Sequence, residues 1–211
     1  MAPTTKPKNT DQCQSLILTS LSAYYKKNNS IRKQLFNLIN GDSKISLRLI
    51  DWFVTHYARV NSIIYWIDNS GNIYNTISAN PSININEFRK FNMYLDYRAQ
   101  LQSYTKLYFD PFRRYSRISF ILEEEPLLSI ESTVGQLNFF RWALQNGVIM
   151  YIQNNIVEIE KNMMAFQKQI KQDEHLLQDV KQSNKIIKKQ KNKQVQNVHI
   201  VSHVPCLIHF D

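Results

Sequence analysis

Arginines and tyrosines interleave just after a proline that should end a helix. Arg113, Arg114 and Arg117 lie within five residues of one another, and a guanidinium group can bind phosphate oxygens in a bidentate manner. Tyr108 and Tyr115 lie beside them and have ring faces on which nucleic-acid bases can stack. This combination predicts a surface that binds phosphates and bases.

The same arginines also have a structural interpretation. Glu123–Glu125 follow within a few residues, and a loop or hairpin would bring these carboxylates opposite the guanidinium groups. Ten aromatic and seven basic side chains lie between residues 88 and 120, and most of the aromatic ones are expected in the core. The sequence leaves both interpretations open.

A second basic segment lies near the C-terminus. Residues 181–193 contain a run of lysines without a single acid, among them Lys185, Lys188 and Lys189. These lysines are further candidates for binding nucleic acid. A charge run is also typical of a solvated helix face, so the pattern alone does not decide.

One cluster has the residue types of a metal site: His199, His203, Cys206 and His209. The segment is typical of a strand, in which His199 and His203 would point one way and Cys206 the other. A closed zinc site usually takes its ligand pairs from turns. We therefore expect no metal, and these four residues remain weak candidates.

No catalytic motif is present. Asp51 and His56 are five residues apart on an expected helix and would not face each other. The four glycines are scattered, so no phosphate-cradling loop is available. We expect a non-enzymatic protein without catalytic residues or a cofactor.

Composition limits the class of protein. The 211 residues are 43% apolar and have a formal charge of +9, which is enough for a core and favours anionic partners such as nucleic acid. Cys13 and Cys206 belong to no paired motif, which favours a reducing compartment. No signal peptide or apolar run long enough to cross a membrane is present. The expected protein is soluble, neither secreted nor transmembrane, with no membrane partner.

The elements that must position these residues follow from periodicity and capping signals. Helices are expected over residues 15–27, 31–39, 43–59, 84–107 and 133–151, a β-hairpin near 63–77, and two strands near 117–130.

A heptad pattern runs from residue 156 to residue 187. Most of its a and d positions are apolar, which predicts a coiled coil and a homo-oligomer. The expected self-association residues are Ile156, Ile159, Met163, Phe166, Ile170, Leu177 and Val180.

The predicted fold class is α+β, with a mostly helical body, a small antiparallel sheet, a long C-terminal helix or coiled coil and a terminal strand. The expected divisions are a flexible tail (1–12), a globular α+β domain (13–155), a basic helical arm (156–194) and a strand packing back on the body (195–211).

Several blocks resemble a known family. They are Ser46–Tyr57, Tyr94–Leu101, Phe109–Arg114 and Gln136–Ala143. They are similar to a family of small uncharacterised proteins of nucleocytoplasmic large DNA viruses, the giant viruses. The resemblance covers roughly residues 15–155. It implies a place in the virus factory of the host cytoplasm or in the virion, and it carries no known activity.

Two functions from different classes follow. The first is a viral nucleic-acid-associated protein that binds DNA or RNA through the arginine segment and the lysine-rich arm. The second is a virion structural or scaffold protein that self-associates through the coiled coil and binds other viral proteins.

Overall fold

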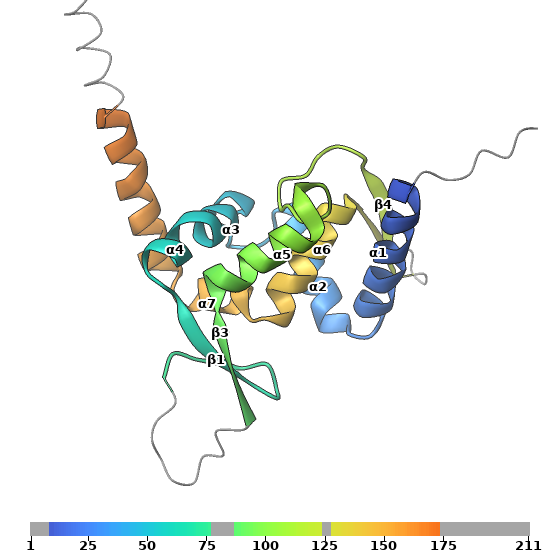
Figure 1. Ribbon diagram of the computed structural model, residues 1–211, viewed down its shortest axis with the longest axis horizontal. Coiled ribbons are helices and arrows are strands. Elements are labelled where there is room, and N and C mark those ends of the chain that lie inside the picture. Colours follow the sequence, from blue (N-terminus) through green and yellow to red (C-terminus); the bar gives the residue numbers. More distant parts are fainter. Residues whose placement is uncertain (1–8, 77–86, 124–127, 174–211) are drawn as a thin grey trace, which may run out of the picture. The chain divides into compact units, whose positions relative to one another are not determined.

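The computed structural model describes residues 9–76, 87–123 and 128–173 (Figure 1). The chain divides into two compact units, Met1–Met163 and Met164–Asp211. The first unit contains all the strands described here and the hydrophobic core, so the α+β class is confirmed. Of the second unit, residues 164–173 are described, and they are helical.

The elements of the first unit are, in chain order, α1 (Asn9–Lys26), α2 (Asn29–Asn40), α3 (Leu47–Trp52), the π-helix η1 (Phe53–Tyr57), α4 (Ala58–Val60), β1 (Ile64–Asp68), β2 (Ile73–Tyr74), β3 (Phe88–Asn92), α5 (Met93–Tyr108), β4 (Ile118–Glu123), β5 (Leu128–Ser132), α6 (Val134–Gln145) and α7 (Val148–Asn154). A further helix covers residues 156–173.

The first two helices agree with the expected pair, with shifted starts. α1 begins at Asn9, so residues 9–12, expected in a tail, are helical. Asn28 caps α2, because its side-chain oxygen accepts bonds from the backbone N–H groups of Ser30 and Ile31. α2 ends at Gly41 in the left-handed conformation (φ 84°), as the sequence predicts.

The third expected helix, residues 43–59, is three segments. Ser46 caps α3 by accepting a bond from the backbone N–H of Leu49. The helix then widens into η1, which turns Phe53, Val54 and Tyr57 toward the core. A π-helical turn has no periodicity signal of its own, and the sequence did not indicate it.

A three-stranded antiparallel sheet has the order β2-β1-β3. β1 and β2 confirm the predicted hairpin. The third strand is a correction: residues 88–92 were expected inside a long helix, but they pair with β1, with Tyr65 opposite Phe91. α5 therefore begins only at Met93, where Asn92 caps it. Pairing with β1 outweighs the weak helical pattern of these residues.

β4 and β5 form a separate two-stranded antiparallel sheet, and these strands confirm the expected pair near residues 117–130. Phe120, Leu122 and Ile130 face the core, whereas Ile121 on the other face is 50% exposed. The sheet packs against α1 and α2.

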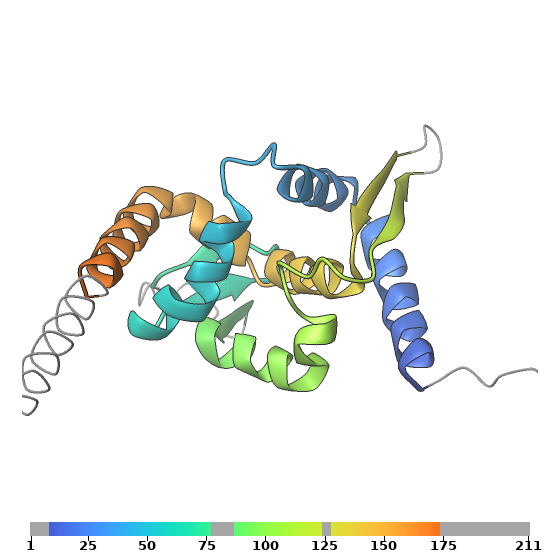
Figure 2. The same ribbon diagram turned by 90° about the horizontal axis from the view of Figure 1, so that it is seen from above.

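α6 is the centre of the first unit's core. Figure 2 shows it between α5 on one side and α2 on the other. Its residues 134–140 are all buried. Phe91, Tyr97, Phe109 and Phe139 surround the ring of Trp142, with centroids 5.4–6.5 Å away.

The helix expected over residues 133–151 breaks at Asn146 and Gly147, where α7 begins. The backbone oxygen of Asn146 accepts the hydroxyl of Tyr65, 2.7 Å away, and its side-chain oxygen accepts a guanidinium N–H of Arg89. The break thus fixes the three-stranded sheet to the helices.

Candidate nucleic-acid interface

The predicted arginines lie on one loop between α5 and β4, residues 111–117, called here the arginine loop. The start of α6 holds this loop. The side-chain amide of Gln136 donates to the carbonyl of Pro111 (3.0 Å), and the hydroxyl of Thr133 donates to the carbonyl of Arg113 (3.3 Å). Both anchoring side chains are buried, so they fix the backbone of the loop.

The residue before the loop is tied to the same helix. The backbone N–H of Asp110 donates to the carbonyl of Gly135, and its carboxylate accepts the N–H of Phe112 at 2.7 Å. A Cβ at Gly135 would lie 2.9 Å from the carbonyl oxygen of Leu107. The absence of a side chain there lets the end of α5 approach the start of α6.

Arg113, Arg114 and Arg117 line one pocket of about 330 Å³. Arg113 is half-buried and the other two are exposed. Glu131 on β5 and the buried Gln136 also line this pocket. The complete lining is Ile39, Asn40, Leu47, Pro111, Phe112, Arg113, Arg114, Arg117, Glu131, Ser132, Thr133 and Gln136.

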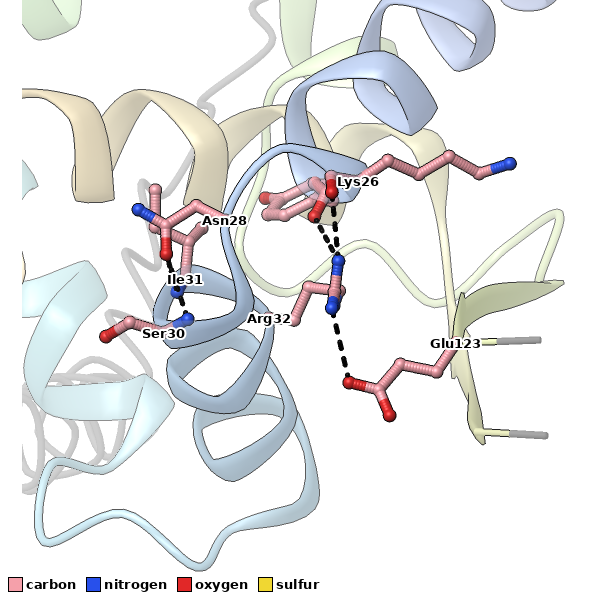
Figure 3. Close-up of polar contacts among 7 residues, drawn as sticks. Lys26, Asn28, Ser30, Ile31, Arg32 and Glu123 are labelled. Carbon is pink, nitrogen blue, oxygen red and sulfur yellow. Dashed lines mark hydrogen bonds and ion pairs between the residues drawn. The ribbon is translucent and has the colours of Figure 1, made fainter. Parts of the chain in front are cut away.

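The alternative interpretation, pairing with Glu123–Glu125, finds no support at Glu123. That carboxylate accepts a bond from the guanidinium of Arg32, 3.4 Å away (Figure 3). The same guanidinium donates to the carbonyls of Tyr25 and Lys26 at the end of α1. Glu124 and Glu125 lie outside the described residues.

The charges of the arginine loop are left unpaired within the part of the chain that the structure describes. There, no carboxylate forms an ion pair with Arg113, Arg114 or Arg117. A pocket lined by unpaired guanidinium groups is suited to an anion that can accept several charge-assisted hydrogen bonds.

The two predicted tyrosines lie next to this pocket. The guanidinium carbon of Arg113 lies 5.7 Å from the ring centroid of Tyr115, which is 78% exposed. A smaller pocket of about 230 Å³ is lined by Arg113, Tyr108 and Tyr115 among others. Tyr108 is half-buried and packs against the core, so Tyr115 is the more accessible ring.

The other binding candidates are the lysines of the second basic segment and the four weak metal-ligand candidates. Lys185, Lys188 and Lys189 lie outside the described residues, as do His199, His203, Cys206 and His209. Within residues 9–76, 87–123 and 128–173, no group of three or more His, Cys, Asp or Glu side chains could hold a metal ion.

Asp51 lies on α3 and His56 on η1. The ring of His56 stacks on that of Trp52, with centroids 5.5 Å apart. Burial, and then repulsion from Asp110, raises the pKa of the Asp51 carboxyl, and the charge of Lys106 partly opposes this. Asp51 and Asp110 are 59 positions apart, so no local sequence pattern predicts that their charges interact.

The self-association candidates divide into two groups. Ile159 is fully buried in the core of the first unit, and Ile156 and Met163 pack against that core. Tyr57 also donates its hydroxyl to the carboxylate of Glu158, 3.0 Å away. Ile156, Ile159 and Met163, the first of the expected a and d positions, thus pack within the chain.

The second group belongs to the second unit. Phe166 is half-buried, and Ile170 is 40% exposed. Leu177 and Val180 lie outside the described residues. Among the helices that the structure describes, none has the length and apolar character needed to cross a membrane.

Comparison with known proteins gives two matches. The model of a family described as a family of unknown function (DUF7197) matches residues 4–210. Uncharacterized protein L507 of Acanthamoeba polyphaga mimivirus is 32% identical over 155 residues, which are 72% of this chain and 54% of that protein. The chain thus spans about half the length of this relative. No solved structure matches the chain. Neither match names an enzymatic activity.

Proposed function

The chain belongs to DUF7197, an uncharacterised family to which the giant-virus resemblance pointed, and we propose that it is a nucleic-acid-associated viral protein. Arg113, Arg114 and Arg117 would bind the phosphates. The observation behind this proposal is the pocket that these three side chains line, without a carboxylate partner for any of them among the described residues.

The geometry of the arginine loop supports binding of a polyanion rather than of a single small ion. Arg114 and Arg117 are exposed, and Arg113 lies beside the exposed ring of Tyr115. A backbone crossing the loop could therefore meet guanidinium groups at successive phosphates. The formal charge of +9 would add a long-range attraction.

Glu131 opposes this function, since it lines the same pocket and carries a negative charge. A negative charge at that place lowers the affinity for phosphate and could restrict which anion geometries fit. It also provides a variant expected to act in the opposite direction from the arginine substitutions.

The test is binding of the purified chain to single- and double-stranded DNA and RNA across a salt series. Replacing Arg113, Arg114 and Arg117 by Glu should weaken binding at least about 10-fold and reduce the slope of log K against log salt by up to about 3. Glu131→Gln should tighten binding.

The charge-matched control reverses three exposed lysines elsewhere, Lys27, Lys33 and Lys161, to Glu. It changes the net charge by the same amount. If this control weakens binding as much as the arginine variant, the affinity comes from net charge alone and the proposed site is wrong.

A self-associating scaffold is the second candidate, supported by the exposure of Ile170 on the helix of residues 156–173. Sedimentation at several concentrations should then show oligomers, which Ile170→Lys or Leu177→Lys converts to monomers. A monomer at every concentration would contradict this candidate. With either function, the proposed place of action is the virus factory of the host cytoplasm or the virion.

A further inference from the structure

The three-stranded sheet has an inner and an outer face, which the burial pattern separates. Tyr65, Ile67 and Phe91 are buried against the helices. Because side chains alternate along a strand, their neighbours point the other way. The lower part of Figure 1 shows β1 and β3 of this sheet below α5 and α7.

An aromatic row crosses the outer face. Trp66 in the central strand is paired with Tyr74 of β2 and with Lys90 of β3. The three side chains therefore share one face and form a line across all three strands. Phe88, opposite Asp68, and Ile64 extend the same face. The set Ile64, Trp66, Tyr74, Phe88 and Lys90 is called here the aromatic platform.

The platform has a defined geometry and is accessible. The ammonium of Lys90 lies 5.9 Å from the centroid of the Trp66 ring. Tyr74 and Phe88 make an edge-to-face contact with centroids 5.4 Å apart. Tyr74 is 40% exposed and Ile64 is 39% exposed, while Trp66 and Phe88 are half-buried.

One acid, Asp68, lies on this face, and its carboxylate is engaged by the hairpin turn. It accepts bonds from the backbone N–H groups of Ser70 and Asn72 and from the Asn72 side chain. It also accepts the hydroxyl of Tyr74 at 3.0 Å. These bonds satisfy the carboxylate and hold the Tyr74 ring in place.

We propose that the aromatic platform stacks the bases of single-stranded nucleic acid. Base faces stack on aromatic side chains irrespective of sequence, and sheets that present aromatic rings with nearby cations use this contact for single strands. Lys90 on the edge strand supplies the positive charge that complements the backbone. The inference rests on the proposed function and deepens it by naming the class of nucleic acid.

The occupant follows from the charge and chemistry of the face. An apolar protein partner would gain nothing from the exposed ammonium that lies over the central indole. A duplex hides its base faces, so Lys90 would be the one platform residue whose charge it could use. A single strand satisfies both the rings and the cation.

The experiment compares an oligothymidine with an abasic oligomer of the same length, which has the phosphates but no bases. The chain should bind the oligothymidine about 10-fold or more tightly, and Trp66→Thr should remove most of this difference. Ile121→Thr, which removes an exposed apolar strand residue from the other sheet, should leave it unchanged.

A second variant covers the case in which Trp66→Thr does not fold. Trp66→Phe keeps a ring, so it should retain binding within a few-fold, but it should lose the quenching of tryptophan fluorescence that a stacked base causes. If the quenching persists in Trp66→Phe, the platform is not the site.

The outcomes for the two proposals are separable. One outcome is that both oligomers bind with equal affinity, that Trp66→Thr leaves this affinity unchanged, and that the triple arginine-to-glutamate variant lowers it. This outcome would overturn the platform and keep the proposed function. Base-dependent binding that the arginine-loop variant leaves intact would overturn the phosphate site and keep the platform. No binding to any oligomer would overturn both.

Discussion

The carboxyl of Asp51 lies in surroundings that disfavour its charged form. Burial and the neighbouring Asp110 raise the pKa of its carboxyl above the ordinary value of 3.8. The folded state therefore binds the proton more tightly than the unfolded chain does. The resulting stability is fully present below the unfolded-state pKa and is lost as the pH rises through the folded-state pKa.

Asp51→Asn removes the charge and should therefore raise the melting temperature at pH 7. The gain should shrink as the pH falls and the wild-type carboxyl takes up its proton. Melting curves recorded at a series of pH values from 7 downward test this. Asp42→Asn, at an exposed position, is the charge-matched control. An equal gain from the control would mean that only net charge matters.

At the same scale, the arginines of the site were predictable and their surroundings were not. Arg113, Arg114 and Arg117 are within five residues, so any turn keeps them close. Gln136 and Glu131 come from α6 and β5, and no local pattern links them to the loop. The aromatic platform was not predicted because its residues come from the β1–β2 hairpin and from β3, and β3 was expected to be part of a helix.

At the scale of elements, the accurate predictions were those with a local chemical signal. The helix expected over residues 31–39 is followed by Asn40-Gly41, a typical helix end, and the hairpin expected near 63–77 has turn-forming residues between its strands. β3 and the break between α6 and α7 depend on contacts distant in sequence. Lys90 pairs with Trp66, and the backbone oxygen of Asn146 accepts the hydroxyl of Tyr65. Both contacts join residues too far apart in the sequence for a local pattern to indicate them.

The break between α6 and α7 predicts a difference between two glycines. Gly41 and Gly147 both have positive φ, 84° and 67°, so alanine should cost about 1–2 kcal/mol at either from backbone strain. At Gly147 a Cβ would also lie 2.5 Å from Cγ2 of Ile73, whereas Gly41 faces open space.

Gly147→Ala should therefore lower the free energy of unfolding by about 1 kcal/mol more than Gly41→Ala, since Ile73 must move. Urea unfolding of both variants measures the difference. Equal losses would mean that β2 shifts at no cost and that its packing against the α6–α7 turn is loose.

At the scale of the whole first unit, tyrosine hydroxyls are a prominent buried polar group. Burial raises the pKa of Tyr57 and Tyr97 to about 12. It also raises the pKa of Tyr24, Tyr25, Tyr65 and Tyr151 above 10.0. The hydroxyls of Tyr25 and Tyr65 donate to the carbonyls of Leu137 and Asn146 and must keep their protons to do so.

The fold should therefore lose stability between about pH 10 and 12. Raised pKa values in the folded state mean that stability is present below the unfolded-state pKa and disappears as the pH rises through the folded-state values. The last part of the rise in tyrosinate absorbance, which comes from the buried tyrosines, should coincide with the loss of circular dichroism. Tyr57→Phe should flatten the pH dependence of the melting temperature. Complete conversion of the tyrosines to tyrosinate before any loss of circular dichroism would contradict this.

The burial of Ile159 has a consequence for how such a chain can evolve. The helix that begins at residue 156 buries Ile159 in the core of the first unit, and Ile156 and Met163 pack against the same core. Recombination that joined a foreign arm at residue 155 would remove these side chains and leave a cavity in the core of the first unit. The body and the base of the arm are therefore expected to be inherited together, and diversification by exchange of arms is expected only beyond residue 163.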